Sequence, residues 1–430
     1  MINKIKIPYN KSYIELEIPE KNIANLIGDG NNLILGSNIE KLKDIFSNYN
    51  GVALEELVQN KRIALIVEDH TRKVPFADRF KILFPKLLSA NQIKIFIATG
   101  THDGEVEGNY KIRSLIYSNA EKCKLNIDKV IIHNCHSDSF YFAGTTSIGN
   151  DIYANHEIVD AEIIIILSDM KNHYFAGYSN PVKSLLPGIC KYETVERNHA
   201  LTLNDKSTFG RHPLHHDESR RDNPLAQDMY EGFKMIASDR SVFVLGTICK
   251  HNQIQWAKFG SMEEVAEEGI LQVDKMNGVH VEATNKIIVS SGGYPNDESL
   301  YISQRALELT KNAVQENGEI LFIAGCANGI GPEKSIANFY EPLKADIEYI
   351  LNSLSEKYVI YSHKTFKFAQ LIKRMKAIYF YSELSNSEIE SIHLYPTDSP
   401  QEIVDQWIAE NENVKISIFT EGNKVAVYSK

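Results

Sequence analysis

Short apolar runs rich in β-branched residues recur along the whole chain, and the stretches between them are long enough for one helix each. The runs are Ile63–Val67, Ile93–Ala98, Val130–His133, Ile163–Leu167, Val242–Ile248, Ile287–Ser290, Ile320–Ala324, Val359–Tyr361, Ile378–Tyr381 and Val414–Phe419. Continuous rather than alternating apolar character is typical of strands that are covered on both faces, as in parallel sheets. The pattern therefore predicts an α/β fold.

Helical periodicity appears between several of these runs. The clearest case follows Pro75, where apolar residues recur at the i, i+3, i+4 spacing of one buried stripe: Phe80, Leu83, Phe84, Leu87 and Leu88. Residues 1–8 instead alternate like an edge strand and lack the apolar stretch of a secretion signal. The segment from Arg197 to Gln227 is polar, His-rich and weakly periodic, which predicts an irregular excursion.

A chain of 430 residues is long enough for two or three domains, each with its own core. A fresh series of strands starts near Ile287, so we place a domain boundary at about residue 275. The sequence thus predicts two α/β domains with mostly parallel sheets, residues 1–275 and residues 276–430.

The composition argues against a nucleic-acid-binding, a membrane-spanning and a disulfide-rich protein. There are 46 Lys plus Arg and 56 Asp plus Glu residues, a formal net charge of −10, which offers no bulk attraction to nucleic acid. The longest strongly apolar run, Ile163–Leu167, is far shorter than the roughly 20 residues of a membrane-spanning helix. The cysteines form an odd set without a C-x-x-C pair, which indicates neither a disulfide framework nor a thiolate zinc site. We expect a cytoplasmic protein with reduced thiols and with neither a nucleic-acid nor a membrane partner.

Polar residues suited to chemistry directly follow three of the predicted strands. They are Glu68–Arg72, Thr99–His102 and Ser168–His173. Ligands of open α/β sheets gather beyond the carboxyl ends of the strands, so these residues are expected at one edge. An edge that combines a cation with several imidazoles suits an anionic substrate and proton transfer.

Each candidate also has a simpler interpretation. A loop histidine such as His102 or His173 commonly caps a helix or bonds a carbonyl group. Lys183 lies among apolar residues in the Gly- and Pro-punctuated segment His173–Gly188. There it could be a nucleophile with a lowered pKa, a phosphate ligand or an ordinary surface lysine.

Four segments together resemble the signature segments of the lactate racemase family, and they occur in the same order. They are Asp69–Pro75, Ala98–His102, His173–Gly188 and Asn198–Ala200. Further similarity appears at Tyr13–Pro19, at Asn223-Pro224 with Asp228, and at Gly292–Asp297 leading into Leu300-Tyr301. The resemblance therefore covers nearly the whole chain.

The resemblance implies a two-domain enzyme whose active-site cleft lies between an N-terminal catalytic, cofactor-binding domain and a C-terminal domain that closes over the substrate. The family uses a nickel-pincer nucleotide, a pyridinium-3-thioamide-5-thiocarboxylic acid mononucleotide that binds nickel and is covalently attached to a lysine. The implied reaction is racemisation or epimerisation at C2 of a 2-hydroxy acid by reversible hydride transfer. The cofactor also implies partners, namely the biosynthesis proteins that mature the enzyme.

Matching the segments residue by residue assigns the implied roles. Lys183 corresponds to the lysine that carries the cofactor, and His199 to the protein ligand of nickel. His102 and His173 correspond to paired acid/bases, which are needed because the hydroxyl group lies on a different side in each enantiomer. The other implied residues are Arg72 for the substrate carboxylate, Asp69 and Thr71 as support for Arg72 or the nucleotide, and Tyr301 on the substrate side.

One departure from the family pattern bears on the substrate. Where lactate-active members carry Gln and, three positions later, Lys, this chain has Ile302 and Arg305. On a helix, Tyr301, Ile302 and Arg305 share one face, and the Arg offers a planar fork suited to a carboxylate. We therefore expect a 2-hydroxy acid other than lactate, with a larger apolar side chain or a second carboxylate.

Two alternative functions stay open. The first is a non-catalytic homologue that binds a nucleotide or an organic acid, suggested by Ile302, by Arg305 and by Asn180-Pro181 in place of the family's small residues. The second is a metal-dependent hydrolase built on His212–His216, although Pro213 breaks a helix there and a solvated loop is the expected structure.

Two further segments carry weaker signals. A Cys–His nucleophile pair within His133–His136 is disfavoured because adjacent residues of an extended segment point apart. Gly325–Gly331 resembles a phosphate loop but lacks the Lys-Ser/Thr of a P-loop, so it is expected to let backbone approach the cleft.

Overall fold

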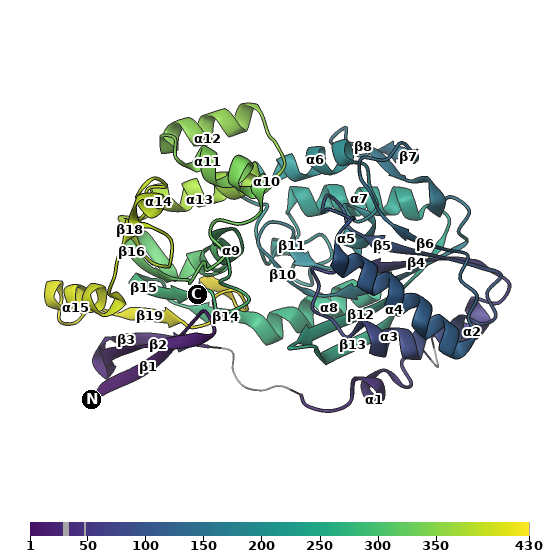
Figure 1. The fold of residues 1–430 in the computed structure, drawn as a ribbon, viewed down its shortest axis with the longest axis horizontal. Helices are drawn as coiled ribbons and strands as arrows, with labels where there is room; N and C mark the ends of the chain where they lie inside the picture. The colour runs from purple at the N-terminus through teal and green to yellow at the C-terminus, as the bar shows by residue number, and fades with distance from the viewer. Residues whose placement is uncertain (29–33, 47–48, 430) are drawn as a thin grey trace. The chain divides into compact units, whose positions relative to one another are not determined.

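The computed structural model describes residues 1–28, 34–46 and 49–429, and the chain forms two compact α/β units (Figure 1). The central unit is Asn32–Lys275, and the terminal unit combines Met1–Asn31 with Met276–Lys430. The expected domain of residues 1–275 is therefore wrong at its start, because the first 31 residues belong to the other unit.

The central unit is built on a six-stranded sheet with the order β13-β12-β9-β4-β5-β6. Its strands are β4 (Arg62–Glu68), β5 (Gln92–Ala98), β6 (Lys129–Ile132), β9 (Ile163–Asp169), β12 (Ser241–Lys250) and β13 (Gln253–Ser261). All neighbours are parallel except the β12–β13 pair. Every strand predicted in this range is present, because the buried apolar runs are long and β-branched.

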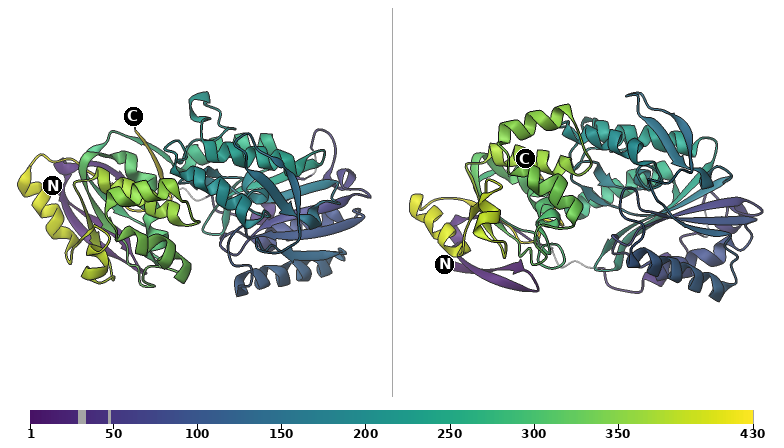
Figure 2. Two further views of the ribbon diagram at one scale, coloured as in Figure 1. Left: turned by 90° about the horizontal axis from the view of Figure 1, so that it is seen from above. Right: turned by 45° about the horizontal axis from the view of Figure 1, so that its top comes forward.

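Helices cover both faces of this sheet (Figures 1 and 2). One face packs on α1 (Asn38–Leu42), α2 (Leu54–Leu57), α3 (Phe76–Leu83) and α4 (Glu107–Cys123). The other side carries α5 (Val182–Leu185), α6 (Tyr192–Ala200), α7 (Pro224–Ala237) and α8 (Met262–Asn277). Gly246 of β12 lets α8 approach closely, since a Cβ there would lie 2.4 Å from Val265 Cγ1. Two small hairpins, β7 (Phe140–Thr145) with β8 (Asp151–Asn155) and β10 (Lys171–His173) with β11 (Gly177–Ser179), complete the unit.

Two local predictions in this unit were partly wrong. Helix α3 ends at Leu83 and continues as a 3₁₀ turn, η2 (Phe84–Leu87), because Pro85 lacks the N–H that an α-helix needs, and Leu88 is 52% exposed. The excursion expected from Arg197 to Gln227 begins inside α6 and ends inside α7, whose first turn is capped by the Asn223 side chain.

The terminal unit has a second six-stranded sheet, all parallel, with the order β18-β17-β16-β15-β19-β3. Its strands are β3 (Ile23–Ile27), β15 (Thr284–Ser290), β16 (Val314–Ile323), β17 (Ala377–Tyr381), β18 (Tyr395–Pro396) and β19 (Ile416–Phe419). A short parallel pair, β14 (Gly278–Val281) with β20 (Ala426–Ser429), forms a separate two-stranded sheet in the same unit. Because β3 pairs with β19, the N-terminal residues join this unit rather than the one that follows them in the chain.

Both faces of the terminal sheet are also buried. The hairpin of β1 (Ile2–Tyr9) and β2 (Ser12–Pro19) packs on one face together with α15 (Pro400–Glu410). The other face packs mainly on α9 (Leu300–Thr310), α11 (Glu341–Leu343), α12 (Ile347–Glu356), α13 (Ser362–Arg374) and α14 (Asn386–Glu390). The short helix α10 (Glu333–Ser335) precedes α11 in the chain. The strand predicted at Val359–Tyr361 is absent, because Tyr361 adopts a φ of 80° and leads into α13.

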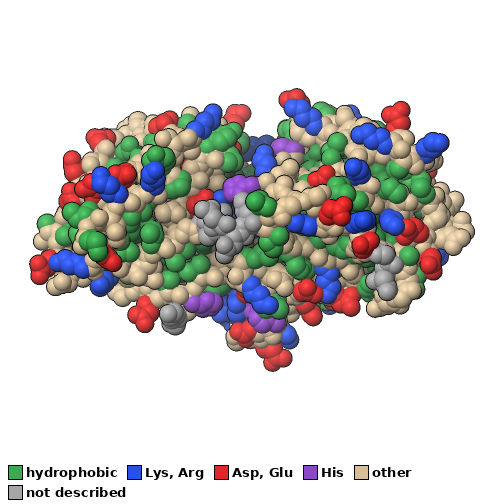
Figure 3. Space-filling view, turned by 90° about the horizontal axis from the view of Figure 1, so that it is seen from below, with side chains coloured by type: hydrophobic (Ala, Val, Ile, Leu, Met, Phe, Trp, Pro, Cys, Tyr) green, Lys and Arg blue, Asp and Glu red, His purple; other side chains and the backbone are tan. Residues whose placement is uncertain are grey.

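Among the described residues, every helix is too short or too polar to span a bilayer. None of the five cysteines forms a disulfide there. On the face drawn in Figure 3, basic and acidic side chains are interspersed over both units.

Candidate functional site

Three adjacent strands of the central unit end beside one another and deliver the expected residues to one edge. The order β9-β4-β5 places the carboxyl ends of these strands side by side. Asp69 directly follows β4, and His102 follows β5 in a turn closed by the His102 N–H donating to the Thr99 carbonyl. His173 ends β10, which continues from β9. The convergence expected from the sequence is thus present in the structure.

Asp69 and His102 form a tight pair. Asp69 is only 3% exposed, and its Oδ2 lies 2.6 Å from His102 Nδ1. The Thr71 hydroxyl donates to Asp69 Oδ1 at 2.6 Å. Burial alone would raise the pKa of Asp69, but the hydrogen bond and charge of His102, with Arg72 and Thr71, hold it at about 2. An ionised Asp69 accepts the Nδ1 hydrogen, so His102 presents Nε2 as a proton acceptor.

His173 and Lys183 form a second pair at the same edge. His173 Nε2 lies 3.1 Å from Lys183 Nζ, and the Ala176 N–H donates to His173 Nδ1 at 3.3 Å. Because Nδ1 accepts, the hydrogen of the neutral ring resides on Nε2 and points at the lysine amine. The His173 ring also meets the Phe175 ring edge-on at 4.4 Å, which fixes its orientation.

The Lys183 amine is unusually easy to deprotonate. Desolvation by the surrounding protein, with the positive charges of Arg72 and Lys171, lowers the pKa of Lys183 to about 7. Its amine stands 5.4 Å from the centre of the Phe175 ring, and part of its side chain reaches solvent. A lowered pKa is a property of nucleophilic lysines, whereas an ordinary surface lysine keeps its usual pKa.

This shift predicts selective acylation of Lys183 at neutral pH. At pH 7 about half of the Lys183 amines are neutral, against about one in 3,000 for an ordinary lysine. Labelling with an N-hydroxysuccinimide ester, mapped by peptide mass spectrometry, should give a rate that rises with pH around a midpoint near 7. Lys364 of α13 is a matched comparison, since its pKa is also about 7 but it is only 5% exposed, and it should label slowly. A Lys183 midpoint near 10 would contradict the assignment.

His199 lies on the last turn of α6 and is 9% exposed. Its ring centre lies 5.4 Å from that of Phe175, so Phe175 contacts both His199 and Lys183. Burial, together with the charges of Lys183 and His102, lowers the pKa of His199 to about 3. The imidazole is therefore neutral at physiological pH, which is the form that binds a metal.

The loop that the sequence predicts at His212–His216 is present, but it is solvated only in part, because His216 is the one exposed histidine of its three. His212 and His215 are 1% and 0% exposed. His212 Nε2 lies 2.9 Å from Asn180 Nδ2, and Asn180 Oδ1 accepts from the Val182 N–H at 2.9 Å. Among the described residues, no group of three His, Cys, Asp or Glu side chains could hold a metal ion. The buried His212 contacts Asn180, which in turn holds the Val182 N–H, so it braces the loop that carries Lys183.

A buried charge network lies behind this edge, and sequence reasoning missed it. Arg79 of α3 is 0% exposed and pairs with Glu68 at 2.8 Å. Glu68 also accepts the Asp169 N–H, while Arg79 donates to Thr247, and Asp169 accepts the Cys249 N–H at 3.0 Å. The network joins the ends of β4, β9 and β12. The sequence did contain one sign of this network, because Arg79 follows Phe76 by three positions and so falls on the buried face of α3.

Tyr301, Ile302 and Arg305 lie in the terminal unit, on α9. They are partly exposed, whereas all other residues of α9 are buried, so they share the uncovered face as expected. The Tyr301 N–H donates to the Ile330 carbonyl at 2.9 Å, and a Cβ on Gly331 would lie 2.9 Å from Tyr301 Cβ. The glycine-rich segment therefore buttresses the start of α9.

His133 and Cys135 are both buried in the central unit. His133 is 0% exposed and its Nε2 lies 2.9 Å from the Cys190 carbonyl oxygen. Burial lowers the pKa of His133 to about 4. Cys135 is buried, and the second ring nitrogen of His133, Nδ1, lies 3.4 Å from Asn155 Nδ2.

Comparison with known proteins matches most of the chain to lactate racemases. Residues 9–210 match the lactate racemase N-terminal domain, and residues 279–427 match the lactate racemase C-terminal domain. The lactate racemase of Thermoanaerobacterium thermosaccharolyticum is 28% identical over 337 residues, 76% of each chain, and that of Lactiplantibacillus plantarum is 25% identical over 438 residues, 98% of this chain and 99% of the relative.

Solved structures share the fold. The lactate racemase apoprotein from T. thermosaccharolyticum superposes with a TM-score of 0.85 at 23% identity, covering 99% of this chain and 100% of that one. A Thermotoga maritima protein superposes with a TM-score of 0.61 at 14% identity, covering 91% and 98%. The chain belongs to the lactate racemase family and is an isomerase of the racemase class.

Proposed function

We propose that the protein interconverts the two configurations at C2 of a 2-hydroxy acid, with a nickel-pincer nucleotide attached to Lys183. The observation that carries the proposal is the Lys183 amine, whose pKa is about 7 and which lies 3.1 Å from His173 Nε2. The Phe175 ring contacts both this amine and the neutral imidazole of His199. The relatives are named lactate racemases, so lactate is the first 2-hydroxy acid to test.

The residues of the edge fit such a cofactor. A neutral amine at Lys183 can form the covalent attachment, and a neutral imidazole at His199 can donate its lone pair to nickel. Asp69 and Thr71 would support Arg72 or the nucleotide. When bound, the group would supply a hydride acceptor, which avoids direct removal of the weakly acidic C2 proton.

The two histidines rest in complementary states. His102 gives its Nδ1 hydrogen to Asp69 and keeps an open lone pair on Nε2, whereas His173 carries its hydrogen on Nε2. In the neutral form each ring has one nitrogen that can take the proton of a substrate hydroxyl group, and the imidazolium that this forms can return the proton. Arg72 would hold the substrate carboxylate through its guanidinium, and Tyr301 would contact the substrate from α9.

The decisive experiment measures intact mass and nickel content of protein produced together with the cofactor-biosynthesis proteins. We expect one mass adduct, localised to Lys183, and about one nickel per chain. Lys183→Met should lack the adduct, whereas the control Lys191→Met, a half-exposed lysine just after the same loop, should keep it. An adduct that persists in Lys183→Met would refute the attachment site. No adduct and no nickel, where a lactate racemase is loaded, would favour the non-catalytic binding homologue.

A further inference from the structure

We infer that Tyr178 and Asp274 form a positioning pair, which holds the β10–β11 hairpin so that His173 and Lys183 stay within hydrogen-bond distance of each other. Each residue of the pair acts through the backbone that it fixes. The inference rests on the proposed function, because that proposal gives His173 and Lys183 their roles. Asp274 lies on α8, 96 positions after Tyr178, so only the fold brings the pair together.

The β10–β11 hairpin connects the two side chains that the proposed function uses. His173 ends β10 and lies opposite Gly177 of β11, and Tyr178 lies opposite Asn172 in the same register. Lys183 follows shortly after β11, on α5. The 3.1 Å between His173 Nε2 and Lys183 Nζ therefore depends on how firmly this hairpin is held.

Tyr178 ties the hairpin to α8. Its side chain is 0% exposed, and its hydroxyl donates to Asp274 Oδ1 at 2.6 Å. The same hydroxyl oxygen accepts a hydrogen bond from Arg220 Nη2 at 3.0 Å. Arg220 Nη1 in turn pairs with Asp274 Oδ2 at 2.9 Å. The three side chains thus close a ring of interactions, which fixes the hairpin more firmly than one hydrogen bond would.

Asp274 is an ionised acceptor at the centre of this network. Burial alone would raise the pKa of Asp274, but the hydrogen bonds from His215 and Tyr178 keep that pKa below its usual value. His215 is 0% exposed, and its Nδ1 accepts the Asp217 N–H at 2.9 Å. The hydrogen of the neutral ring is therefore on Nε2, which lies 3.2 Å from Asp274 Oδ2. Hydrogen bonds to a charged acceptor are the strong ones, so Asp274 is a firm anchor.

A second route leads from the same network to Lys183. The Arg220 carbonyl accepts the His212 N–H at 2.9 Å. The His212 ring contacts the Asn180 side chain, and the Asn180 carbonyl accepts the Lys183 N–H at 3.1 Å. The network therefore holds the lysine from its own loop as well as through the hairpin.

A purely structural role for the pair predicts a different result from a positioning role. A network that only stabilises the fold changes the free energy of unfolding and leaves the folded site as it is. A positioning network also alters the site of the folded protein, where a displacement of about 1 Å costs up to roughly 10²-fold in rate. The pKa of the Lys183 amine in unloaded protein and kcat of the loaded enzyme distinguish the two roles.

The test uses Tyr178→Phe, which deletes the hydroxyl and changes no charge. Acylation of Lys183 in unloaded protein, measured against pH, should have its midpoint about one pH unit higher than in the wild type, because a looser hairpin admits water to the amine. In the loaded enzyme, kcat should fall roughly 10- to 100-fold while KM stays nearly unchanged. Asp274→Asn should also raise the midpoint, although the loss of a negative charge would by itself lower it.

The double variant Tyr178→Phe, Asp274→Asn shows whether the two residues act as a pair. Because each acts through the other, the double variant should lose no more kcat than the more affected single variant. Additive losses would mean that the residues act separately and would overturn the pairing.

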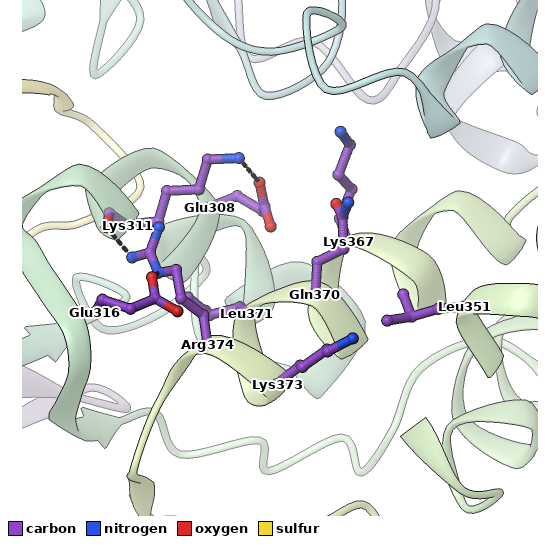
Figure 4. A pocket seen from close by; sticks show the side chains of 9 residues that line it. All are labelled: Glu308, Lys311, Glu316, Leu351, Lys367, Gln370, Leu371, Lys373 and Arg374. Atoms are coloured by element: carbon purple, nitrogen blue, oxygen red, sulfur yellow. Dashed lines mark hydrogen bonds and ion pairs between the residues drawn. The ribbon is translucent and has the colours of Figure 1, made fainter. Parts of the chain in front are cut away.

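The matched control is Glu308→Gln in the terminal unit. Glu308 is a carboxylate with 1% exposure that pairs with Lys311 at 3.0 Å, as the dashed line in Figure 4 shows, and both residues line a cavity of about 470 Å³. Loss of this ion pair should lower the temperature of thermal unfolding without moving the Lys183 midpoint.

An unchanged Lys183 midpoint in Tyr178→Phe, whatever its unfolding temperature, would overturn the inference and leave the proposed function standing. Failure of the wild-type protein to take up cofactor and nickel would instead refute the proposed function. The midpoints are measured on unloaded protein, so they would still decide whether Tyr178 and Asp274 position the lysine.

Discussion

His102→Asn and His173→Asn should each lower kcat for interconversion by roughly 10²–10⁴-fold, the usual contribution of one acid/base group. Each histidine handles the hydroxyl proton on one side of the substrate, and a racemase must pass through both sides in every turnover. Loss of either ring therefore stops both directions. Attachment of the cofactor at Lys183 should persist, because neither ring supplies the amine.

The measurement is chiral chromatography of the product, with intact mass on the same preparations. His136→Asn is the matched control, since His136 is an exposed histidine of the same unit that stacks on Tyr192. It should retain wild-type activity. Two variants that both keep full activity would eliminate the two-histidine mechanism.

Arg79→Met should destabilise the central unit by about 3–5 kcal/mol, because it leaves Glu68 buried without its cation. The carboxylate oxygens of Glu68 and Asp169 hold the ends of β4, β9 and β12 together, so the loss reaches the strands that carry the site. Denaturant unfolding monitored by circular dichroism measures the effect. Arg113→Met, an exposed arginine of α4, should change the free energy of unfolding by less than about 0.5 kcal/mol.

The double variant Glu68→Leu, Arg79→Leu sharpens this prediction. Removal of both charges avoids the unpaired buried carboxylate and should recover much of the lost stability. Equal losses in the single and double variants would mean that packing around Arg79, rather than its charge, accounts for the effect.

Parts of the fold could be predicted because they depend on local composition. β4 and β9 are unbroken apolar runs, and the parallel sheet follows from them. The strand predicted at Val359–Tyr361 shows where this fails, since a run of three residues is too short to define a strand. Tyr361 instead has a left-handed φ of 80° and meets the ring of Tyr301 edge-on at 6.1 Å. The place of β3 depended on a partner strand far along the chain, which no local pattern reveals.

The candidate site divides in the same way. The segments around His102, His173 and Lys183 could be identified from their motifs and from their positions after strands. The low pKa of the lysine could not, because it arises from desolvation and from cations that only the folded chain brings near. The low pKa of Lys364 could not be predicted for the same reason, since Lys364 and Tyr301, which it contacts, are 63 positions apart in the sequence.

The pairing of β3 with β19 has a consequence during synthesis on the ribosome. Asn22 donates to the Glu412 carbonyl across a sequence separation of 390 residues. At 5–20 residues per second, a nascent chain needs about 20–80 s to make that partner. The central unit is complete long before then and can fold first, whereas β3 still lacks its pairing strand and the β1–β2 hairpin lacks the sheet face on which it packs. The terminal unit therefore assembles last, and its early strands are the segment most in need of chaperone protection.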